Sequence, residues 1–296
     1  MTGVAAIEVR ARSVDAVLLQ ALDRGLRARV HSVFARAVNV VTPEGALLTL
    51  VDAARDDAPD TLVADADGYD AMGLRRDDPV VAVGGVLALG ACLRVRFDRA
   101  QPWVAWLPAF ADASTGWRAN VTAVAACLAS SSPCSVDDAL HEVARRALAF
   151  HAAALVDALA AGDAAGAGQH ATSLLGLGPG LTPSGDDLLV GLLAVLAIPG
   201  SPARRLRGVR GAMLARADER THLISLSALR AAAQGRVRAG LATLLDAMLT
   251  GTVDAAVAAL APVLAIGATS GRDICDGVLR GFEVQRRLHA AWRRAA

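Results

Sequence analysis

The sequence predicts an α+β protein in which a β-rich domain, barrel-like or sandwich-like, precedes an α-helical domain. The first part of the 296-residue chain consists of short valine- and leucine-rich segments separated by turn residues, which is typical of strands. From about Asn120 the pattern changes to long alanine- and leucine-rich segments, which favour helix. We place the boundary near Ser114 to Ala119, so the β-rich domain is expected over residues 1–118 and the helical domain over residues 119–296.

The individual elements follow from local patterns along the chain. Strands are expected, in order, in the segments RARVHSVFARAVNVV, ALLTLVD, PVVAVGGVLALGACLRVRF and PWVAW. The turn TPEG, Thr42 to Gly45, has proline second and glycine last, so a hairpin is expected there. In the second part, a long helix is expected to start from a Ser135 cap, with Asp138 three residues later, and to end at Gly162.

Composition excludes several classes of function. The formal net charge is +1, so the chain lacks the basic excess that binding to nucleic acid requires. All 30 basic residues are arginine, which excludes a Walker-type phosphate-loop lysine and a lysine Schiff base. The longest apolar helical run, Leu188 to Ile198, is too short to span a bilayer, and the N-terminus shows no signal-peptide hydrophobic region. We therefore expect a cytoplasmic protein that does not enter a membrane.

Cysteines and histidines form no familiar metal-binding or catalytic pattern. The cysteines include no CxxC pair and no zinc spacing, so reduced and buried thiols are expected. The histidines are scattered without an HExxH motif, and His222 has no partner spacing that suggests a catalytic triad. These residues are Cys92, Cys127, Cys134, Cys275, His31, His141, His151, His170, His222 and His289.

One segment, GLGPGLTPSGDDLLVGLL at residues 176–193, joins a glycine- and proline-rich loop to an apolar helix. Backbone amides at such a helix start favour an anion, with hydroxyls from Thr182 and Ser184 beside them. Two aspartates, Asp186 and Asp187, would however repel a bare phosphate by about 1 kcal/mol or more each in a dry site. The segment therefore predicts a divalent metal bridging to phosphate, an amide or carbamoyl NH₂ donor, or an arginine from elsewhere in the chain.

A second segment, GATSGRDICDGVLRGF at residues 267–282, repeats the first at a constant offset of 86 residues. The recurring residues are a serine, a glycine, an aspartate, a second glycine and a leucine, which indicates a repeated structural unit. Asp187 and Asp273 are corresponding positions, and across a pseudo-twofold axis they could share a cation such as Mg²⁺. The competing interpretation is a pair of ordinary helix caps in which each aspartate complements the helix dipole.

A third segment, ERTHLISLSALRAAAQGR, contains Thr221 and Ser225 ahead of a helical stretch. Hydroxyls spaced in this way suit the lining of a pocket, but hydrogen bonds to the helix backbone explain them equally well. The complete set of predicted substrate-binding residues is Gly178, Gly180, Thr182, Ser184, Gly185, Asp186, Asp187, Thr221, Ser225, Ser270, Gly271 and Asp273, with Asp187 and Asp273 also the candidate metal ligands.

These three segments together resemble the AllH-like subunits of a multi-subunit oxamate carbamoyltransferase. The resemblance is strong over residues 175–197, fair over 267–282 and 220–235, and loose around 32–50. It implies a complex that converts carbamoyl phosphate and oxamate to oxalurate and phosphate, or the reverse, in purine or ureide breakdown, with other subunits as partners. The chain departs from the expected pattern at Ala268-Thr269, where relatives are expected to have a histidine before the second Ser-Gly.

The chain is not expected to catalyse this reaction alone. Ornithine and aspartate carbamoyltransferases have a Ser-Thr-Arg-Thr phosphate loop and a His-Pro segment, whereas here no histidine precedes proline. The segment STGWR, Ser114 to Arg118, matches only the first two positions of that loop. The leading hypothesis is therefore a carbamoyltransferase subunit with a phosphate- or carbamoyl-binding site, and the alternative is a non-catalytic scaffold or ligand-binding subunit whose motifs cap and pack helices.

Overall fold

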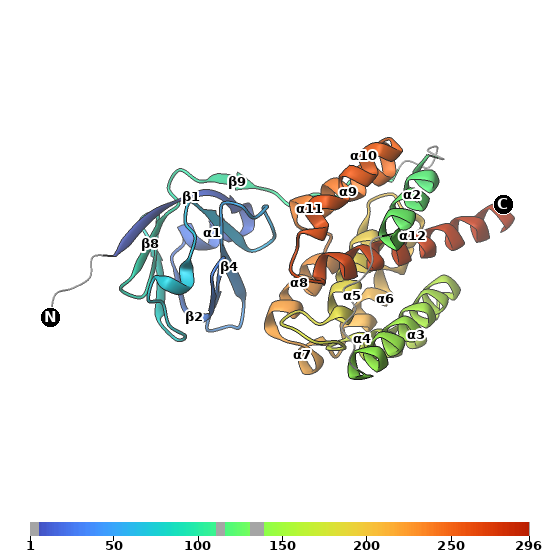
Figure 1. Ribbon diagram of the computed structural model, residues 1–296, viewed down its shortest axis with the longest axis horizontal. Coiled ribbons are helices and arrows are strands. Elements are labelled where there is room, and N and C mark those ends of the chain that lie inside the picture. Colours follow the sequence, from blue (N-terminus) through green and yellow to red (C-terminus); the bar gives the residue numbers. More distant parts are fainter. Residues whose placement is uncertain (1–5, 111–115, 131–138, 296) are drawn as a thin grey trace. The chain divides into compact units, whose positions relative to one another are not determined.

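The computed structural model describes residues 6–110, 116–130 and 139–295. These residues divide into two compact units, Met1–Ala105 and Trp106–Ala296 (Figure 1). The division precedes the boundary expected between residues 118 and 119 because Leu107 and Phe110 already pack into the core of the helical unit.

The first unit is a closed β-barrel (Figure 1). Its strands are hydrogen-bonded in the order β5-β4-β3-β2-β6-β7-β8-β1, and the β1–β5 pairing closes the ring. Strand β9 extends the sheet beyond β8 by pairing with the last residues of β1. The predicted α+β class is confirmed, and of the two forms considered for the β-rich domain the structure has the barrel. The elements are β1 (Ile7–Asp15), α1 (Ala16–Asp23), β2 (Leu26–Phe34), β3 (Ala37–Val41), β4 (Leu47–Asp52), β5 (Thr61–Ala64), a 3₁₀ turn η1 (Tyr69–Ala71), β6 (Pro79–Val83), β7 (Val86–Leu89), β8 (Leu93–Arg96) and β9 (Gln101–Trp103).

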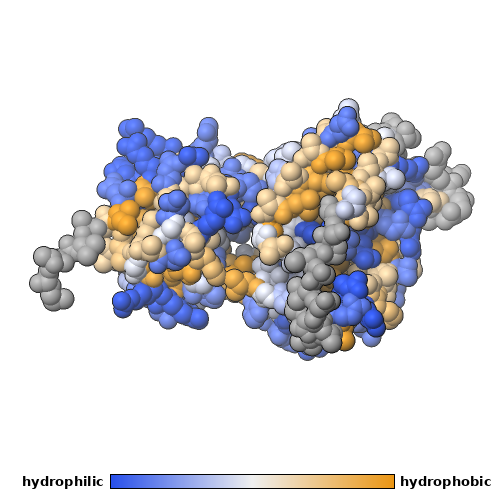
Figure 2. Space-filling view, in the orientation of Figure 1, coloured by the Kyte–Doolittle hydropathy of each residue, from blue (hydrophilic) through white to orange (hydrophobic). Residues whose placement is uncertain are grey.

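Alternation of side chains explains how the barrel strands fold. Along β6 and β8, buried apolar residues alternate with exposed residues, as expected when one face of a strand covers the core. The predicted hairpin at TPEG is confirmed: Gly45 N donates to Thr42 O at 3.0 Å, and the turn joins the antiparallel strands β3 and β4. Hydrophilic residues cover much of the surface of this unit that is visible in Figure 2.

The second unit is helical, and α5 lies at its centre. Every residue of α5 from Gly185 to Leu196 is buried, which explains why its sequence is apolar on all sides rather than on one face. In the described part of the chain, no helix is both long enough and apolar enough to cross a membrane. The helices are α2 (Trp117–Ser130), α3 (Ala139–Ala161), α4 (Ala164–Leu174), α5 (Ser184–Ala197), a 3₁₀ turn η2 (Pro202–Leu206), α6 (Arg207–Leu214), α7 (Ala217–Arg220), α8 (Leu223–Ala233), α9 (Ala239–Thr250), α10 (Val253–Ala258), α11 (Leu260–Leu264) and α12 (Ser270–Ala295).

The long helix predicted before α4 corresponds to α3. Its predicted end is confirmed, because α3 finishes at Ala161 and Gly162 follows with φ of +76°. This left-handed conformation suits glycine at a helix C-terminus. The predicted cap residues, Ser135 and Asp138, lie outside the described residues.

Helices α5 and α12 pack against each other more closely than ordinary side chains allow. A Cβ atom added at Gly191 would overlap the carbonyl oxygen of Ile274, and one added at Gly277 would overlap that of Leu188. These two contacts are related by the 86-residue offset of the sequence repeat. Further along both helices, Gly281 lies against Val195. Because the contacts advance together along the two helices, α5 and α12 run parallel, and both begin at the same end of the pair.

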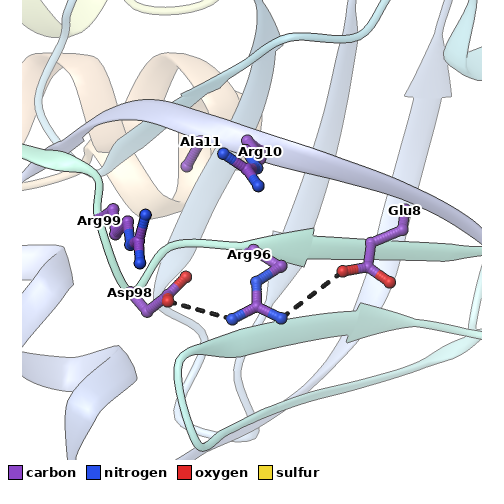
Figure 3. Close-up of a pocket in the computed structure, with 6 residues that line it drawn as sticks. All are labelled: Glu8, Arg10, Ala11, Arg96, Asp98 and Arg99. Atoms are coloured by element: carbon purple, nitrogen blue, oxygen red, sulfur yellow. Dashed lines mark hydrogen bonds and ion pairs between the residues drawn. The ribbon is translucent and has the colours of Figure 1, made fainter.

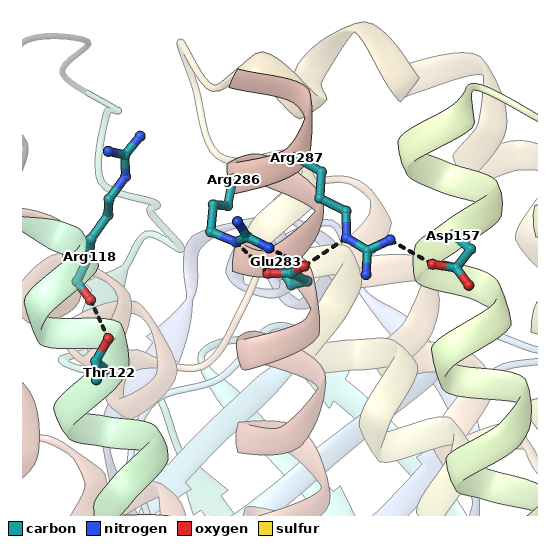
Figure 4. Close-up of polar contacts among 6 residues, drawn as sticks. All are labelled: Arg118, Thr122, Asp157, Glu283, Arg286 and Arg287. Carbon is teal, nitrogen blue, oxygen red and sulfur yellow. Dashed lines mark hydrogen bonds and ion pairs between the residues drawn. The ribbon is translucent and has the colours of Figure 1, made fainter. Parts of the chain in front are cut away.

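An ion-pair network fixes the later part of α12 against α3 (Figure 4). Arg287 donates from Nε to Glu283 at 2.7 Å and pairs through Nη1 with Asp157 of α3 at 2.6 Å. Hydrogen bonds from Arg286 and Arg287 lower the pKa of Glu283 to about 2. This network orients α12 along its length, while the repeated motif occupies its start.

Replacing Gly191 or Gly277 by alanine should test the close packing of α5 and α12. Overpacking a core typically costs about 1–3 kcal/mol, and here the obstacle is backbone, so we expect the free energy of unfolding to fall by about 3 kcal/mol or more. Gly211→Ala is the matched control because Gly211 lies within α6 and a Cβ added there would meet no neighbouring atom. That variant should gain up to about 1 kcal/mol. Similar effects of all three substitutions in denaturant unfolding would contradict the packing argument.

Candidate functional site

The predicted loop and helix start lie where the sequence placed them, but their hydroxyls have a different role. Helix α5 begins at Ser184, and the residue before it, Pro183, offers no side-chain hydrogen bond to cap the helix. Instead, Thr182 Oγ1 lies 2.9 Å from Oγ of Ser270, at the start of α12. The hydroxyls of one copy of the motif face the other copy.

Asp186 holds the loop in place. Its Oδ1 accepts a hydrogen bond from Gly176 N at 2.9 Å, and its Oδ2 accepts one from the Thr221 hydroxyl. The residue is 1 % exposed, so both carboxylate oxygens are satisfied inside the protein. Thr221, a predicted pocket residue, thus contributes to the site through Asp186. The hydroxyl of Ser225, on α8, is buried and has no hydrogen-bond partner among the described residues.

Asp187 and Asp273 form a crossed arrangement with the hydroxyls of the opposite motif. The hydroxyl of Ser270, on α12, hydrogen-bonds to Asp187, on α5. Reciprocally, the hydroxyl of Ser184, on α5, hydrogen-bonds to Asp273, on α12. Thr182 lies near Asp187 and Thr269 near Asp273, and each hydroxyl lowers the pKa of its neighbouring carboxyl group. The structure therefore brings the two predicted helix starts together as one pseudo-symmetric cluster.

The ionised form of both carboxylates in this cluster is unfavourable inside the protein. Burial is the main cause that raises the pKa of Asp187 and of Asp273, each to about 6. The charge of Asp273 raises the pKa of Asp187 further, whereas the hydroxyl hydrogen bonds oppose the shift. Asp187 is only 7 % exposed. Near neutral pH the pair is largely ionised, at the positive ends of two parallel helices.

One oxygen of each carboxylate has no hydrogen-bond partner among the described residues. These atoms are Oδ2 of Asp187 and Oδ2 of Asp273, and both are buried. Buried polar atoms in native proteins are nearly always satisfied, so two orphaned oxygens at corresponding positions of the repeat make these carboxylates candidate ligand contacts. Two buried acceptors of this kind suit a ligand with two N–H donors or a cation.

The glycines of the two motifs have separate roles. At Gly185 and Gly271, an added Cβ would overlap the carbonyl oxygens of Leu174 and Val263, so these glycines allow each helix start to pack on the end of the preceding helix. In the loop, Gly178 and Gly180 have φ of +110° and +102°. That left-handed backbone is strained for other residues.

The loop before α5 is three residues longer than its counterpart before α12. Gly185 N donates to Leu177 O, eight residues earlier, whereas Gly271 N donates to Ile266 O, five residues earlier, and both bonds are 2.9 Å long. Leu181, within the longer loop, is 58 % exposed. The cluster is thus symmetric in its carboxylates and serine hydroxyls but asymmetric in the loop beside them.

The described residues contain no group of three or more histidine, cysteine, aspartate or glutamate side chains placed to hold a metal ion. Any Mg²⁺ at the cluster would therefore be held by Asp187 and Asp273 together with hydroxyls. Cys275 is buried on α12, and burial raises the pKa of its thiol to about 12, which makes it unreactive. Cys134 lies outside the described residues.

Sequence reasoning missed Thr269, whose hydroxyl contacts Asp273. Thr269 belongs to the Ala268-Thr269 pair, where a histidine was expected from the family pattern. Its place in the repeat, opposite Pro183 in the first copy, was the available signal. The substitution therefore leaves a polar side chain at this position of the cluster.

Asparagine at Asp187 and at Asp273 should stabilise the protein at neutral pH. The folded pKa of about 6 lies above the ordinary aspartate value of 3.8, so the folded state binds protons more tightly, and wild-type stability rises as pH falls through 6. The double variant lacks this penalty, and its advantage should be roughly 1–3 kcal/mol near neutral pH and shrink towards about pH 4. Denaturant unfolding at several pH values measures this. Asp254→Asn, at an exposed position of α10, is the control, and an equal pH-dependent gain in it would contradict the strain.

The neighbouring variant Asp186→Asn should have the opposite effect. Its amide would present a donor to Gly176 N or to the Thr221 hydroxyl, where the carboxylate accepts from both. An unmade buried hydrogen bond costs roughly 1–3 kcal/mol, so the unfolding free energy should fall by about that amount. Thr221→Val removes the same bond from the other side, and unchanged stability in both variants would contradict the structural role of Asp186.

Comparison with protein families agrees with both units. A model of the oxamate carbamoyltransferase subunit AllH matches residues 174–282, which include the crossed cluster. A model of the AllH family N-terminal domain matches residues 10–102, which include most of the barrel. No solved structure gives a significant match. Because the two matches together take in about two thirds of the chain, this protein belongs to the AllH family.

Proposed function

We propose that the crossed cluster is the substrate site that this subunit contributes to a carbamoyltransferase complex. Its ligand is the NH₂ group of oxamate or carbamoyl phosphate, held between Asp187 and Asp273. The observation that supports this best is the pair of buried, unpartnered Oδ2 atoms. The family name, a subunit of oxamate carbamoyltransferase, supports the same chemistry and the presence of other subunits as partners.

The donors of the ligand match the acceptors of the cluster in number and charge. A primary amide nitrogen has two N–H groups, and the two carboxylates present two free acceptors. Both proposed substrates join this NH₂ to a carbonyl and, further on, to an anionic carboxylate or phosphate group. Backbone amides of Gly178 to Gly185, with the hydroxyls of Thr182 and Ser184, are the proposed contacts of that anion. The positive ends of α5 and α12 favour it.

The raised pKa of the carboxylates suits the proton transfer that the reaction requires. When the oxamate nitrogen attacks the carbamoyl carbon, a C–N bond forms, the C–O bond to phosphate breaks, and the nitrogen loses a proton. A carboxylate with a pKa of about 6 accepts that proton more readily than one with an ordinary pKa. Phosphate leaves with the electron pair of the broken bond. Such chemistry belongs in the cytoplasmic breakdown of purines or ureides, which we include in the proposal.

Magnesium is the other ligand that the same carboxylates suit. Mg²⁺ is commonly bound by one or two carboxylates together with substrate phosphate oxygens, so Asp187 and Asp273 fit it chemically. Its charge would neutralise the phosphate that the aspartates repel. If Mg²⁺ is bound there, the activity of the complex should require added Mg²⁺ and should be lost when a chelator removes it. Direct binding of the NH₂ group predicts no such requirement.

The second candidate function is that of a non-catalytic scaffold subunit. The observation that favours it is the overlap at Gly185, Gly191, Gly271 and Gly277, because helix packing alone explains these glycines. Packing does not explain the orphaned carboxylates, which a scaffold would more stably replace with amides or apolar residues. The site interpretation is therefore the stronger of the two.

The test is activity of the reconstituted complex with Asp187→Asn and Asp273→Asn, singly and together. An amide places a donor against the substrate NH₂ and removes the base, so oxalurate formation should fall at least 100-fold. Asp254→Asn, at an exposed position of α10, should retain activity. Full activity of the double variant in an intact complex would contradict the proposed substrate site and support the scaffold function. Thermal-shift titration of the subunit with oxamate should show stabilisation that both variants lose.

A further inference from the structure

A cluster of arginines lies on the outer face of the barrel, in the unit that the proposed function does not use (Figure 3). Strands β1 and β8 pair in parallel with Arg10 directly opposite Arg96. Like charges in this position repel and destabilise a sheet. Arg99, in the turn after β8, faces the same space. Three guanidinium groups therefore line one space, although like charges on paired strands are unfavourable for the sheet.

Two acidic residues, Glu8 and Asp98, line the same space as the three arginines and leave one positive charge in excess. Arg96 donates to Asp98 at 3.1 Å and lies 3.7 Å from Glu8, so both acids orient the same guanidinium. In the described ranges, neither Arg10 nor Arg99 has a hydrogen bond or an ion pair with a side chain. Both retain their full set of N–H donors beside the oriented Arg96.

Backbone hydrogen bonds hold the turn after β8, which lines this cavity. Phe97 N donates to Gly85 O at 2.8 Å, and Ala100 N donates to Phe97 O at 3.0 Å, which closes the turn that contains Asp98 and Arg99. Gly85 has φ of +77°, and an added Cβ would lie 2.8 Å from the Cβ of Asp98. Glycine at this position therefore lets the turn pack against the β6–β7 hairpin. The cavity has a volume of about 280 Å³.

We propose that this cavity binds a small molecule through a phosphate or carboxylate group, held between Arg10 and Arg99. Guanidinium groups bind such planar or tetrahedral oxyanions with two parallel hydrogen bonds. The anion also offsets the positive charge that remains after Glu8 and Asp98 pair with Arg96. The volume, against about 30 Å³ for a water molecule, accommodates the oxyanion with a small substituent. This site is independent of the proposed function of the helical unit.

Isothermal titration of the whole chain with inorganic phosphate, and separately with malonate, tests the site. Ionic strength is held constant with sodium chloride so that general screening does not contribute. We expect Arg10→Gln and Arg99→Gln each to weaken binding at least tenfold. Arg12→Gln is the matched control, because Arg12 lies two residues along β1, is exposed, and is paired with Asp65. Its affinity should equal that of the wild type.

Binding of either anion with this dependence on Arg10 and Arg99 supports the site, and the tighter of the two identifies the oxyanion. Binding that survives both substitutions places the anion elsewhere and overturns the inference. Equal weakening by Arg12→Gln shows a diffuse effect of charge and also overturns it. If neither phosphate nor malonate binds, the inference is likewise overturned. Because two different arginines are tested, misfolding of one variant, checked by thermal unfolding, leaves the other to decide.

Discussion

The close contact between the backbones of α5 and α12 is the constraint on which the helical unit depends. Gly191 and Gly277 bring the two helices together where any side chain would overlap a carbonyl oxygen. Because the helices are parallel, this contact also brings their starts together, and with them the hydroxyls of one motif and the carboxylate of the other. The glycines are thus structural in what they touch, yet they determine the geometry of the carboxylate cluster.

Adjacent aspartates illustrate how the same side chain is fully hydrogen-bonded at one position and left without a partner for one oxygen at the next. Asp186 points towards the loop and α8, where two donors satisfy it completely. Asp187 points towards α12, where burial and a second carboxylate oppose its charge and one oxygen is left without a partner. A fold selected only for stability would avoid the second arrangement, because an unpaired buried charge is among the costliest groups a protein can contain.

Local sequence patterns predicted most of the strands and the repeat, but they missed β1 and β5 and the partners that tertiary structure brings together. Alternation along the strands and the turn at TPEG depend on neighbouring residues, so the β-rich unit and its hairpin could be predicted. Closure of the barrel through β1 and β5 depends on residues about fifty positions apart, and the choice between barrel and sandwich stayed open. Likewise, the 86-residue repeat predicted that Asp187 and Asp273 correspond. The contact between Thr182 and Ser270 joins residues 88 positions apart, which rules based on neighbouring residues do not reach.

The three additional residues in the loop before α5 make the two sides of the carboxylate cluster different. A fully symmetric cluster would not fix the orientation of a bound ligand. A cluster with true twofold symmetry would hold a primary amide equally well in two orientations, and the remainder of the ligand would point to either side. Only the first motif has the longer loop, with the left-handed glycines Gly178 and Gly180 and the exposed Leu181. The loop packs on Ser184 through Gly178. Its Thr182 hydroxyl reaches Ser270, while the shorter connection before α12 offers no hydroxyl at the corresponding position. The repeat therefore supplies two matching acceptors, and the unequal loops supply a direction in which an unsymmetrical substrate would be held.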